Sequence, residues 1–418
     1  MDKLKIGILG ASRGMDFAMK LLLDYEYADI AAVCETYPPL LEKTKDFFRE
    51  NGRSDVLCCE SFDDMLGCGI DAVVIANYAN EHAPYAIKAL KSGVHVFSEV
   101  QPTETLAEAC ELCDAVEESG KIYAYGENYC FRDSIFAMRD VCLSGGIGEP
   151  VCLEGTFIND CSFKWHLLTR GVRDHWRNFV PSTFYCTHSI GPLMYSTGLR
   201  AVRVSGAEMP RMSYMAEKGA RSGSAAMELM EMSNGGMGRS MNGNLRHPYE
   251  ASYRIIGESG SIESDPGSIR VYRLKKDYIY DTERYVAKPP AYRFRPDSDL
   301  GEADNSIITA FAYFVGAIYG DSEGIEHTID VYKALDMSLP GLLAYRSIVS
   351  GGAPYEVPDM RDTAARERYR EDFYSTNPKT PERYRLPTSK SGTPEVDDTI
   401  YEKVKEELLK IDLTPGMK

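Results

Sequence analysis

The sequence contains no apolar run that approaches the roughly 18 to 20 residues needed for a membrane-spanning helix. It also has no excess of basic residues, since 47 Lys and Arg stand against 63 Asp and Glu, for a formal net charge of −16. An acidic protein is repelled by nucleic acid and by anionic membrane surfaces, so we expect neither as a partner. No signal-peptide h-region precedes the first strand-like run, which predicts a cytoplasmic location.

A set of cysteines and histidines with metal-site spacing is also missing. The chain has 11 cysteines, an odd number, and they are scattered through apolar patterns. Cys110 and Cys113 lie on one predicted helix, but no second Cys/His pair with ligand spacing accompanies them. We therefore predict no metal site, and we interpret the cysteines as reduced residues that serve as small hydrophobes.

The pattern that is present predicts a two-domain protein. A length of 418 residues exceeds what one hydrophobic core usually holds. Over residues 1–125 short apolar runs alternate with helical patterns, from KIGILGA to KIYAYGE. This alternation is typical of βαβ units and predicts an α/β domain, a Rossmann-type doubly wound parallel sheet.

Residues 126–353 show a different pattern, in which one helical segment is followed by runs of strands such as EASYRIIGESGSIES. Consecutive strands predict an α+β domain with a large, mostly antiparallel sheet. In residues 354–418 Pro, Asp, Arg and Tyr dominate and the periodicity fades. We expect an extended C-terminal tail that packs along the surface or onto a partner subunit.

The first predicted strand leads into the turn GILGASRGM, which partly matches the G-x-G-x-x-G dinucleotide fingerprint. Gly10 holds the first position, Ser12 and Met15 replace the other two glycines, and Gly14 stands one place early. In the fingerprint the glycines let the backbone approach a pyrophosphate at the helix N-terminus. The partial match predicts a dinucleotide site, with a tight turn that holds no ligand as the alternative.

Glu35 ends the second predicted strand, where a carboxylate accepts hydrogen bonds from the ribose hydroxyls and repels a 2′-phosphate. This favours NAD, whereas Arg13 in the turn favours NADP, and we predict NAD. His82 also suits a structural position at the start of a helix. The residues predicted to bind the cofactor are Gly10, Ser12, Arg13, Gly14, Met15, Glu35, Ala76, Asn77, His82, Glu99 and Asn128.

Three stretches resemble segments of the Gfo/Idh/MocA family, named after glucose–fructose oxidoreductase and inositol dehydrogenase: IDAVVIANYANEHAPYAIKALKSGVHVFSEVQPTETLAEACELCDAVEESGK, FRDSIFAMRDVCLSGGIGEPVCLEGTF and GLLAYRSIVSGGAPYEVPD. The resemblance covers nearly the whole chain up to the predicted tail. It implies a Rossmann domain followed by an α/β domain whose large sheet often mediates oligomers. We therefore expect a homo-oligomer, either a dimer or a tetramer.

The typical turn of this family is Glu-Lys-Pro, whose lysine helps to place the nicotinamide and substrate and takes part in proton transfer. Here Glu99 matches the glutamate, Val100 the lysine and Gln101 the proline. A valine side chain neither donates nor accepts a proton. The ordinary dehydrogenase arrangement is therefore incomplete at this turn.

The motifs GENYCFRD and STFYCTHSIGPLMYSTG are similar to the NAD-dependent glycosidase branch of the family, typified by bacterial α-N-acetylgalactosaminidase. That branch also has valine at the lysine position and reads close to Y-P-T-H-G-L-G-P around its active-site histidine, which His188 matches. Here Cys186 replaces the proline and Ser189-Ile190 replaces Gly-Leu, so the sugar that the chain accepts stays open. The branch usually carries a leader sequence, which we do not expect in this chain.

The resemblance implies a redox-neutral cleavage of a hexopyranoside. The C3 hydroxyl gives a hydride to NAD, the resulting ketone acidifies the C2 proton, a base removes that proton, the anomeric substituent leaves, water adds, and the ketone is reduced again. We predict Tyr129 and His188 as proton carriers and Glu99 as a substrate-orienting residue. A tyrosine base needs a lowered pKa. The residues predicted to contact the sugar are Tyr185, Tyr249, Trp176 and Arg177.

Two alternatives to the glycosidase remain open. The first is a conventional NAD-dependent sugar or polyol dehydrogenase with a rearranged proton relay. The second is a non-catalytic regulator that binds NAD. The missing lysine favours the glycosidase and the regulator, whereas the retained Tyr129 and His188 favour an enzyme.

Overall fold

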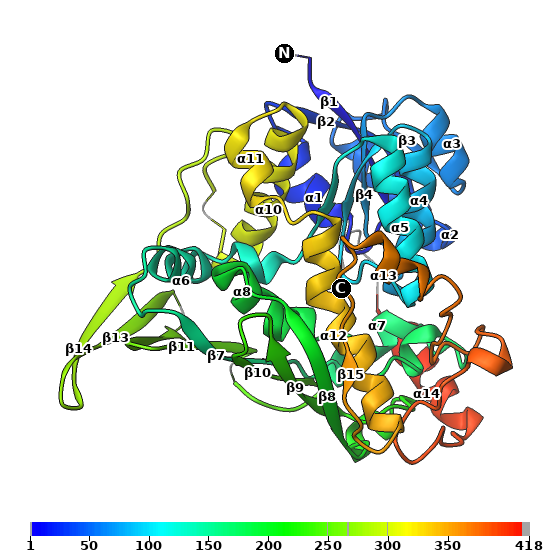
Figure 1. The fold of residues 1–418 in the computed structure, drawn as a ribbon. Coiled ribbons are helices and arrows are strands. Elements are labelled where there is room, and N and C mark those ends of the chain that lie inside the picture. Colours follow the sequence, from blue (N-terminus) through cyan, green and yellow to red (C-terminus); the bar gives the residue numbers. More distant parts are fainter. Residues whose placement is uncertain (1, 249, 266, 299, 412–418) are drawn as a thin grey trace. The chain divides into compact units, whose positions relative to one another are not determined.

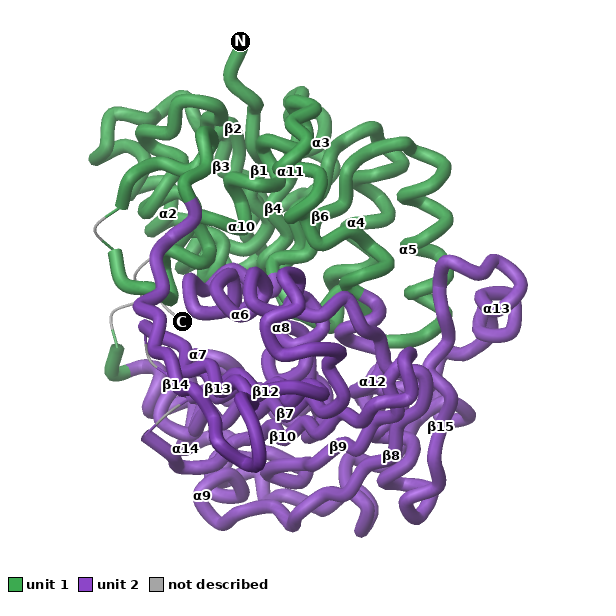
Figure 2. Tube along the Cα trace, turned by 60° about the vertical axis from the view of Figure 1, so that its left-hand side comes forward, with its two compact units in different colours: residues 1–126, 291–334, 410–418 green, residues 127–290, 335–409 purple. Residues whose placement is uncertain are grey.

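The computed structural model describes residues 2–411 except 249, 266 and 299 (Figure 1). The chain forms two compact units, drawn in two colours in Figure 2. The first unit comprises residues 1–126, 291–334 and 410–418. The second unit comprises residues 127–290 and 335–409. The division differs from the three expected segments, because residues 291–334 join the N-terminal unit and most of the expected tail joins the second unit.

The described residues of the first unit form a six-stranded sheet in the order β3-β2-β1-β4-β5-β6, and its neighbouring strands are parallel. This is the strand order of a dinucleotide-binding Rossmann sheet, whose direction of winding reverses between β1 and β4. The prediction of a doubly wound parallel sheet is confirmed. The strands are β1 Leu4–Leu9, β2 Ala28–Cys34, β3 Leu57–Cys59, β4 Ala72–Ile75, β5 His95–Ser98 and β6 Tyr123–Tyr125.

Helices of the first unit come from both of its main segments. The ring of Phe311 lies 5.7 Å from that of Phe17 and 5.6 Å from that of Phe97, so α10 shares the core of this sheet. This aromatic packing explains why residues 291–334 belong here. The helical elements are α1 Met15–Phe17, η1 Ala18–Leu22, α2 Pro38–Glu50, α3 Phe62–Gly67, η2 Ala79–Glu81, α4 His82–Lys91, α5 Leu106–Ser119, α10 Glu302–Ile318, α11 Ser322–His327 and the first residues of α12 Val331–Val349.

In the second unit the described residues form a nine-stranded sheet in the order β14-β13-β12-β11-β7-β10-β9-β8-β15. Only β7 and β10 pair in parallel among these strands, so the prediction of a mostly antiparallel sheet is confirmed. The strands are β7 Pro150–Ile158, β8 Ala201–Met209, β9 Ala225–Met232, β10 Met237–Gly243, β11 Ala251–Gly257, β12 Gly260–Asp265, β13 Ser268–Lys276, β14 Ile279–Val286 and β15 Tyr355–Glu356.

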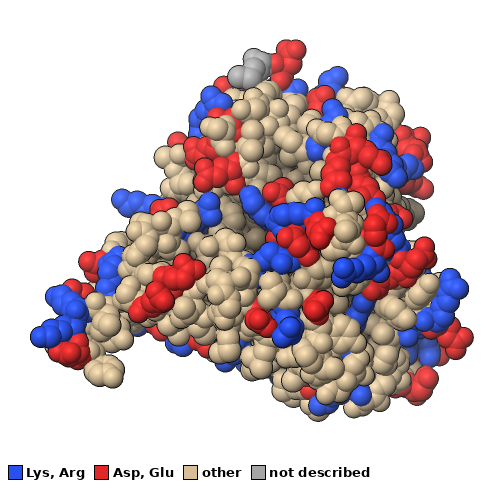
Figure 3. All heavy atoms as spheres, in the orientation of Figure 1, with Lys and Arg blue, Asp and Glu red and all other residues tan. Residues whose placement is uncertain are grey.

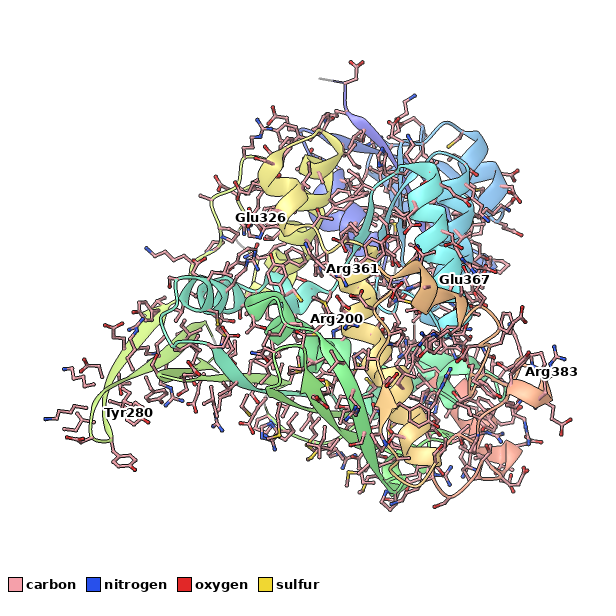
Figure 4. The ribbon with its side chains drawn as sticks, in the orientation of Figure 1. Arg200, Tyr280, Glu326, Arg361, Glu367 and Arg383 are labelled. Atoms are coloured by element: carbon pink, nitrogen blue, oxygen red, sulfur yellow. The ribbon has the colours of Figure 1, made fainter. Side chains whose placement is uncertain are left out.

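Helix α8 packs against β7, β10 and β11, and helix α6 packs against β12 and β13. The hairpin of β13 and β14 extends beyond these helices (Figure 1), and Tyr280 lies near its end (Figure 4). The helical elements of this unit are η3 Asn128–Phe131, α6 Asp133–Leu143, η4 Ser162–Lys164, α7 Trp165–Thr169, η5 Trp176–Asn178, α8 Thr187–Thr197, α9 Ser213–Ala216, most of α12, α13 Thr363–Glu367, η6 Glu382–Tyr384 and α14 Asp398–Leu408.

The segment expected to form a tail is fixed to the second unit by polar contacts. Arg361 joins Arg200 on the carboxylate of Asp336, at 2.8 and 3.1 Å (Figure 4). Further along, the Thr388 hydroxyl donates to the Arg221 carbonyl at 2.9 Å.

On the face shown in Figure 3, basic side chains lie among acidic ones rather than apart from them. No helix in the described ranges has the length and apolar character that a membrane crossing requires.

Candidate functional site

The turn after β1 is shaped by close backbone contacts in the first unit. Gly10 has a φ of +96°, which disfavours L side chains, and a Cβ there would lie 2.6 Å from the Ala76 carbonyl oxygen. A Cβ at Gly14 would lie 2.4 Å from the Gly10 carbonyl oxygen. Both positions therefore require glycine, although their spacing departs from the fingerprint. The half-buried Ser12 lies between them, and the buried Met15 begins α1.

Glu35 stands directly after β2 and binds this turn. Its Oε2 accepts from the Ala11 amide at 2.9 Å and its Oε1 accepts from the Tyr37 amide at 2.8 Å. A carboxylate has about four acceptor positions, so these two bonds leave capacity for ribose hydroxyls. The buried carboxylate thus links the turn to the end of β2, where a dinucleotide ribose lies in Rossmann sheets.

Arg13 forms ion pairs with two carboxylates of the same unit. Its Nε donates to Glu99 Oε1 at 2.6 Å, and its Nη1 donates to Asp16 Oδ2 at 2.7 Å. Burial lowers the pKa of Arg13, Glu99 and Asp16 raise it, and the net direction is upward. The guanidinium is therefore already paired with carboxylates, which makes it less suited to bind the 2′-phosphate of NADP. Val100 follows Glu99 half-buried, and its peptide bond to Gln101 is cis.

Three further predicted cofactor residues surround the end of β4. Ala76 approaches Gly10, as described above, and Asn77 follows it. The Asn77 Oδ1 atom is buried and has no hydrogen-bond partner within the described residues. His82 Nδ1 lies 2.9 Å from the Gln101 carbonyl oxygen, and burial lowers the pKa of this histidine. His82 therefore fixes the turn after β5 as a neutral structural residue, whereas Asn77 presents an unsatisfied acceptor that suits a bound ligand.

The second unit places His188 at the start of α8, next to a fully buried carboxylate. His188 Nδ1 lies 2.8 Å from Glu127 Oε1, which also accepts from the Tyr129 amide at 3.2 Å. Since a carboxylate oxygen only accepts, Nδ1 carries the proton, and Nε2 is left as the reactive nitrogen. The motif GENYCFRD contains Glu127, but the sequence pattern assigns it no role. Its place two residues before Tyr129 is the one feature of the sequence that points to it.

Two other predicted site residues, Tyr129 and Tyr185, lie next to this imidazole. The His188 ring centroid lies 4.7 Å from that of Tyr129 and 5.9 Å from that of Tyr185, which is stacked nearly parallel to it. Phe157 of β7 completes the cluster at 4.5 Å. The Tyr253 hydroxyl donates to the His188 carbonyl at 2.7 Å and so fixes the backbone. Asn128, at the start of η3, is also in this unit, away from the turn after β1 in the chain.

The surroundings of Tyr129 do not supply the lowered pKa that a tyrosine base needs. Its side chain is buried, and the Arg132 guanidinium lies 3.9 Å from its ring centroid. Burial raises the pKa of Tyr129, Arg132 opposes this, and a hydrogen bond to the Glu250 carboxylate raises the pKa further. The net direction is strongly upward. Tyr129 is therefore a neutral phenol in this environment.

A pocket borders the cluster within the second unit. Its lining includes Tyr185, Phe157 and Arg177, whose guanidinium lies 5.6 Å from the Tyr185 ring centroid. Trp176 is buried behind Arg177 rather than in the lining, and Tyr249 lies outside the described residues. Within the described chain, no three or more His, Cys, Asp or Glu side chains group in a way that would hold a metal ion.

The sheet order, the glycine turn and the carboxylate after β2 define a dinucleotide-binding Rossmann protein. Residues 4–127 match the Gfo/Idh/MocA family, described as an oxidoreductase family with an NAD-binding Rossmann fold. The match covers the N-terminal domain alone, and over this domain the predicted resemblance to the oxidoreductase family is confirmed.

The chain resembles several curated proteins and solved structures, three of which are described here. A glycosyl hydrolase family 109 protein of Shewanella pealeana is 26% identical over 204 residues, which cover 46% of this chain and 44% of that protein. A glycosyl hydrolase family 109 protein of Phocaeicola vulgatus is 22% identical over 405 residues, which cover 87% of this chain and 96% of that protein. An inositol dehydrogenase homolog from Azotobacter vinelandii, solved with NADH and myo-inositol, has a TM-score of 0.67 at 17% identity, over 85% of this chain and 98% of that one. The family therefore includes proteins named as glycosidases and as dehydrogenases.

Proposed function

We propose that the protein is an NAD-dependent glycosidase that cleaves a hexopyranoside by transient oxidation at C3, elimination, water addition and re-reduction. The observation that carries this proposal is the pairing of His188 with the buried Glu127, beside Tyr129 and a pocket lined in part by Tyr185. Val100 adds support, because it stands where dehydrogenases resembling this chain have lysine. The likeness to proteins named glycosyl hydrolase family 109 points the same way.

The first unit fits NAD. Gly10 and Gly14 leave backbone space for a pyrophosphate, Glu35 has acceptor capacity for the adenosine ribose, and Asn77 offers an unsatisfied buried acceptor. When bound, NAD supplies a hydride acceptor for C3 and returns that hydride at the end of the cycle. Glu35, with Arg13 already paired, favours NAD over NADP.

The second unit supplies proton chemistry. With Nδ1–H held by Glu127, His188 presents Nε2 to take the proton of the C3 hydroxyl and later to return it. The Glu127 carboxylate stabilises the imidazolium that forms. Tyr129, next to the imidazole, is the group we assign to the C2 proton.

The pocket suits a carbohydrate ring. The half-buried Tyr185 presents a ring on which a sugar face can stack, and Arg177 and Asn159 add hydrogen-bond donors to the lining. Glu99 remains a predicted substrate-orienting residue, and its pairing with Arg13 fixes its carboxylate. Trp176 contacts the pocket indirectly, through Arg177.

The test uses 4-nitrophenyl hexopyranosides incubated with the full-length protein in D₂O, with and without added NAD. Release of nitrophenol together with deuterium at C2 of the sugar is the expected result. His188→Ala should abolish the release, whereas Glu258→Gln, a change of an exposed acid in the turn after β11, should leave it unchanged. Steady accumulation of NADH from a free sugar would instead establish a dehydrogenase, and binding without turnover would establish a regulator.

A conventional sugar or polyol dehydrogenase is the second candidate. The fold likeness to the inositol dehydrogenase homolog favours it, since that protein was solved with NADH and myo-inositol. Val100 opposes it. If Val100→Lys created strong sugar oxidation and left the cleavage of glycosides intact, the assignment of Val100 to the glycosidase chemistry would be wrong.

The expected homo-oligomer is part of the proposal. Large apolar side chains are exposed on adjacent strands of the nine-stranded sheet, namely Val151, Met227, Leu229, Met237 and Ile256. An exposed apolar surface of this kind commonly marks a protein interface. Sedimentation velocity of the wild type should give a dimer or tetramer, and Leu229→Asp combined with Met237→Asp should give monomer.

A further inference from the structure

Tyr129 needs a partner if it is to take a proton from carbon. Its surroundings keep the phenol protonated, because burial and the Glu250 carboxylate raise its pKa and only Arg132 opposes them. A neutral phenol accepts a proton only if its own proton leaves at the same time. The Arg132 guanidinium lies 3.9 Å from the Tyr129 ring centroid and 3.6 Å from Glu250 Oε2, so the Glu250 carboxylate stands beside the phenol, where that proton can go.

Glu250 is held in place from several sides within the second unit. Its backbone carbonyl accepts from the Ile158 amide at 2.7 Å, where β7 ends, and the residue itself immediately precedes β11. The Asn159 side-chain amide donates to Glu250 Oε1 at 2.7 Å. Arg132 Nη2 lies 3.6 Å from Glu250 Oε2. The carboxylate is thus oriented by a neutral donor and a cation.

The same carboxylate reaches solvent. The Glu250 side chain is 41% exposed, whereas the Glu127 side chain is fully buried. A proton received by Glu250 can therefore leave to water. The charged and titratable groups that face this carboxylate are Tyr129, Arg132, Tyr253 and Cys161.

We propose that Glu250 is the proton-accepting partner of Tyr129, so that the two residues together remove the C2 proton of the oxidised sugar. This inference rests on the proposed function. As the C2–H bond breaks, its electron pair enters the enolate of the C3 ketone and its proton joins the Tyr129 oxygen. The phenol O–H bond breaks in the same step, and that proton joins the Glu250 carboxylate. Glu250 then releases the proton to water.

The test compares wild type, Glu250→Gln and Glu250→Asp. Glu258→Gln is the matched control, because Glu258 follows β11 directly, as Glu250 precedes it. The probe is methyl 3-ketoglucoside in D₂O, because its C2 exchange is followed by NMR without any hydride transfer. It is measured with and without NAD. Turnover of the 4-nitrophenyl glycoside that the wild type cleaves is measured in parallel, together with single-turnover reduction of NAD at 340 nm.

Glu250→Gln should slow C2 exchange and kcat by about 100-fold, the usual scale of general acid–base catalysis. KM and the single-turnover reduction of NAD should change little. Glu250→Asp should recover at least about a tenth of the wild-type exchange, and Glu258→Gln should match the wild type.

Exchange at the wild-type rate in Glu250→Gln, beside an active wild type, overturns this inference and leaves the proposed function standing. An equal loss of NAD reduction and C2 exchange also overturns this inference, because that pattern indicates general damage to the site. A wild type that neither exchanges C2 nor releases nitrophenol overturns the proposed function and this inference with it. If circular dichroism shows that Glu250→Gln does not fold, Glu250→Asp tests the inference instead. The expected result is then slower C2 exchange at an unchanged KM. Unchanged C2 exchange would overturn the inference.

Discussion

Glu228 should make the stability of the second unit depend on pH. It lies on β9 with its side chain in the interior, where Oε1 accepts from Asn242 Nδ2 at 2.7 Å. Burial raises its pKa from 4.5 to about 8, and hydrogen bonds to Ser240 and Asn242 only partly oppose this. Ser240 in turn bonds the Ser189 hydroxyl at 2.6 Å, directly after His188.

The sign follows from the two protonation states. Between pH 4.5 and about 8 the unfolded chain has Glu228 ionised, whereas the folded protein keeps it protonated. The unfolded state therefore binds fewer protons, and the free energy of unfolding falls as the pH rises through this interval. At about 1.4 kcal/mol for each pH unit, the interval amounts to about 5 kcal/mol at most. Glutamine keeps the shape and the acceptor for Asn242 but does not ionise.

Glu228→Gln should therefore remove this dependence. Both tryptophans, Trp165 and Trp176, are buried in the second unit, so urea unfolding followed by their fluorescence reports on the unit that contains Glu228. The variant should gain stability relative to wild type by several kcal/mol between pH 5 and pH 8. Glu231→Gln, a change of an exposed acid on the same strand, should keep the wild-type slope. If Glu228→Gln also kept that slope, the carboxyl would not be held protonated, and the reasoning would fail.

Three further substitutions test the two sites. Glu127→Gln removes the charge that holds His188 and should lower kcat by about 100-fold with NAD affinity unchanged; a normal kcat would show that the pair is only structural. Gly10→Ala introduces strain of roughly 1 to 3 kcal/mol at a left-handed φ and should weaken NADH binding at least about tenfold in a fluorescence titration, so unaltered binding would remove the turn from the cofactor site. Glu35→Gln should weaken NAD by about tenfold and narrow its preference over NADP, and an unchanged ratio of the two dissociation constants would contradict its assignment to the ribose.

The sequence was sufficient for the fold because local patterns determine it. Alternating apolar runs and helices predicted the parallel sheet, and the runs of strands predicted the antiparallel one. The grouping of residues 291–334 with the N-terminal unit was not predictable in the same way. Helix α10 is recognisable from its apolar residues, but its packing partner depends on rings at Phe17 and Phe97, far away in the chain. Nothing in the local pattern identifies such a partner.

The site likewise contains residues that local motifs predict and residues that they do not. Tyr129, His188 and Tyr185 followed from motifs, and the structure brings these three together. The acids next to these residues could not be predicted from motifs. Glu127 is 61 positions from His188, and Glu250 is 91 positions from Asn159. Their contacts depend on where chain segments meet in space, which periodicity does not specify.

The position of Glu250 depends on the register of β11 against β7. Ala251 pairs with Phe157, so the residue before it falls opposite the end of β7, beside Asn159 and within reach of Tyr129. A slip of one residue would turn the side chains of β11 to the opposite face of the sheet and remove the Tyr253 hydroxyl from the His188 carbonyl. The register that packs the core of the second unit is therefore the same register that places a carboxylate against the phenol.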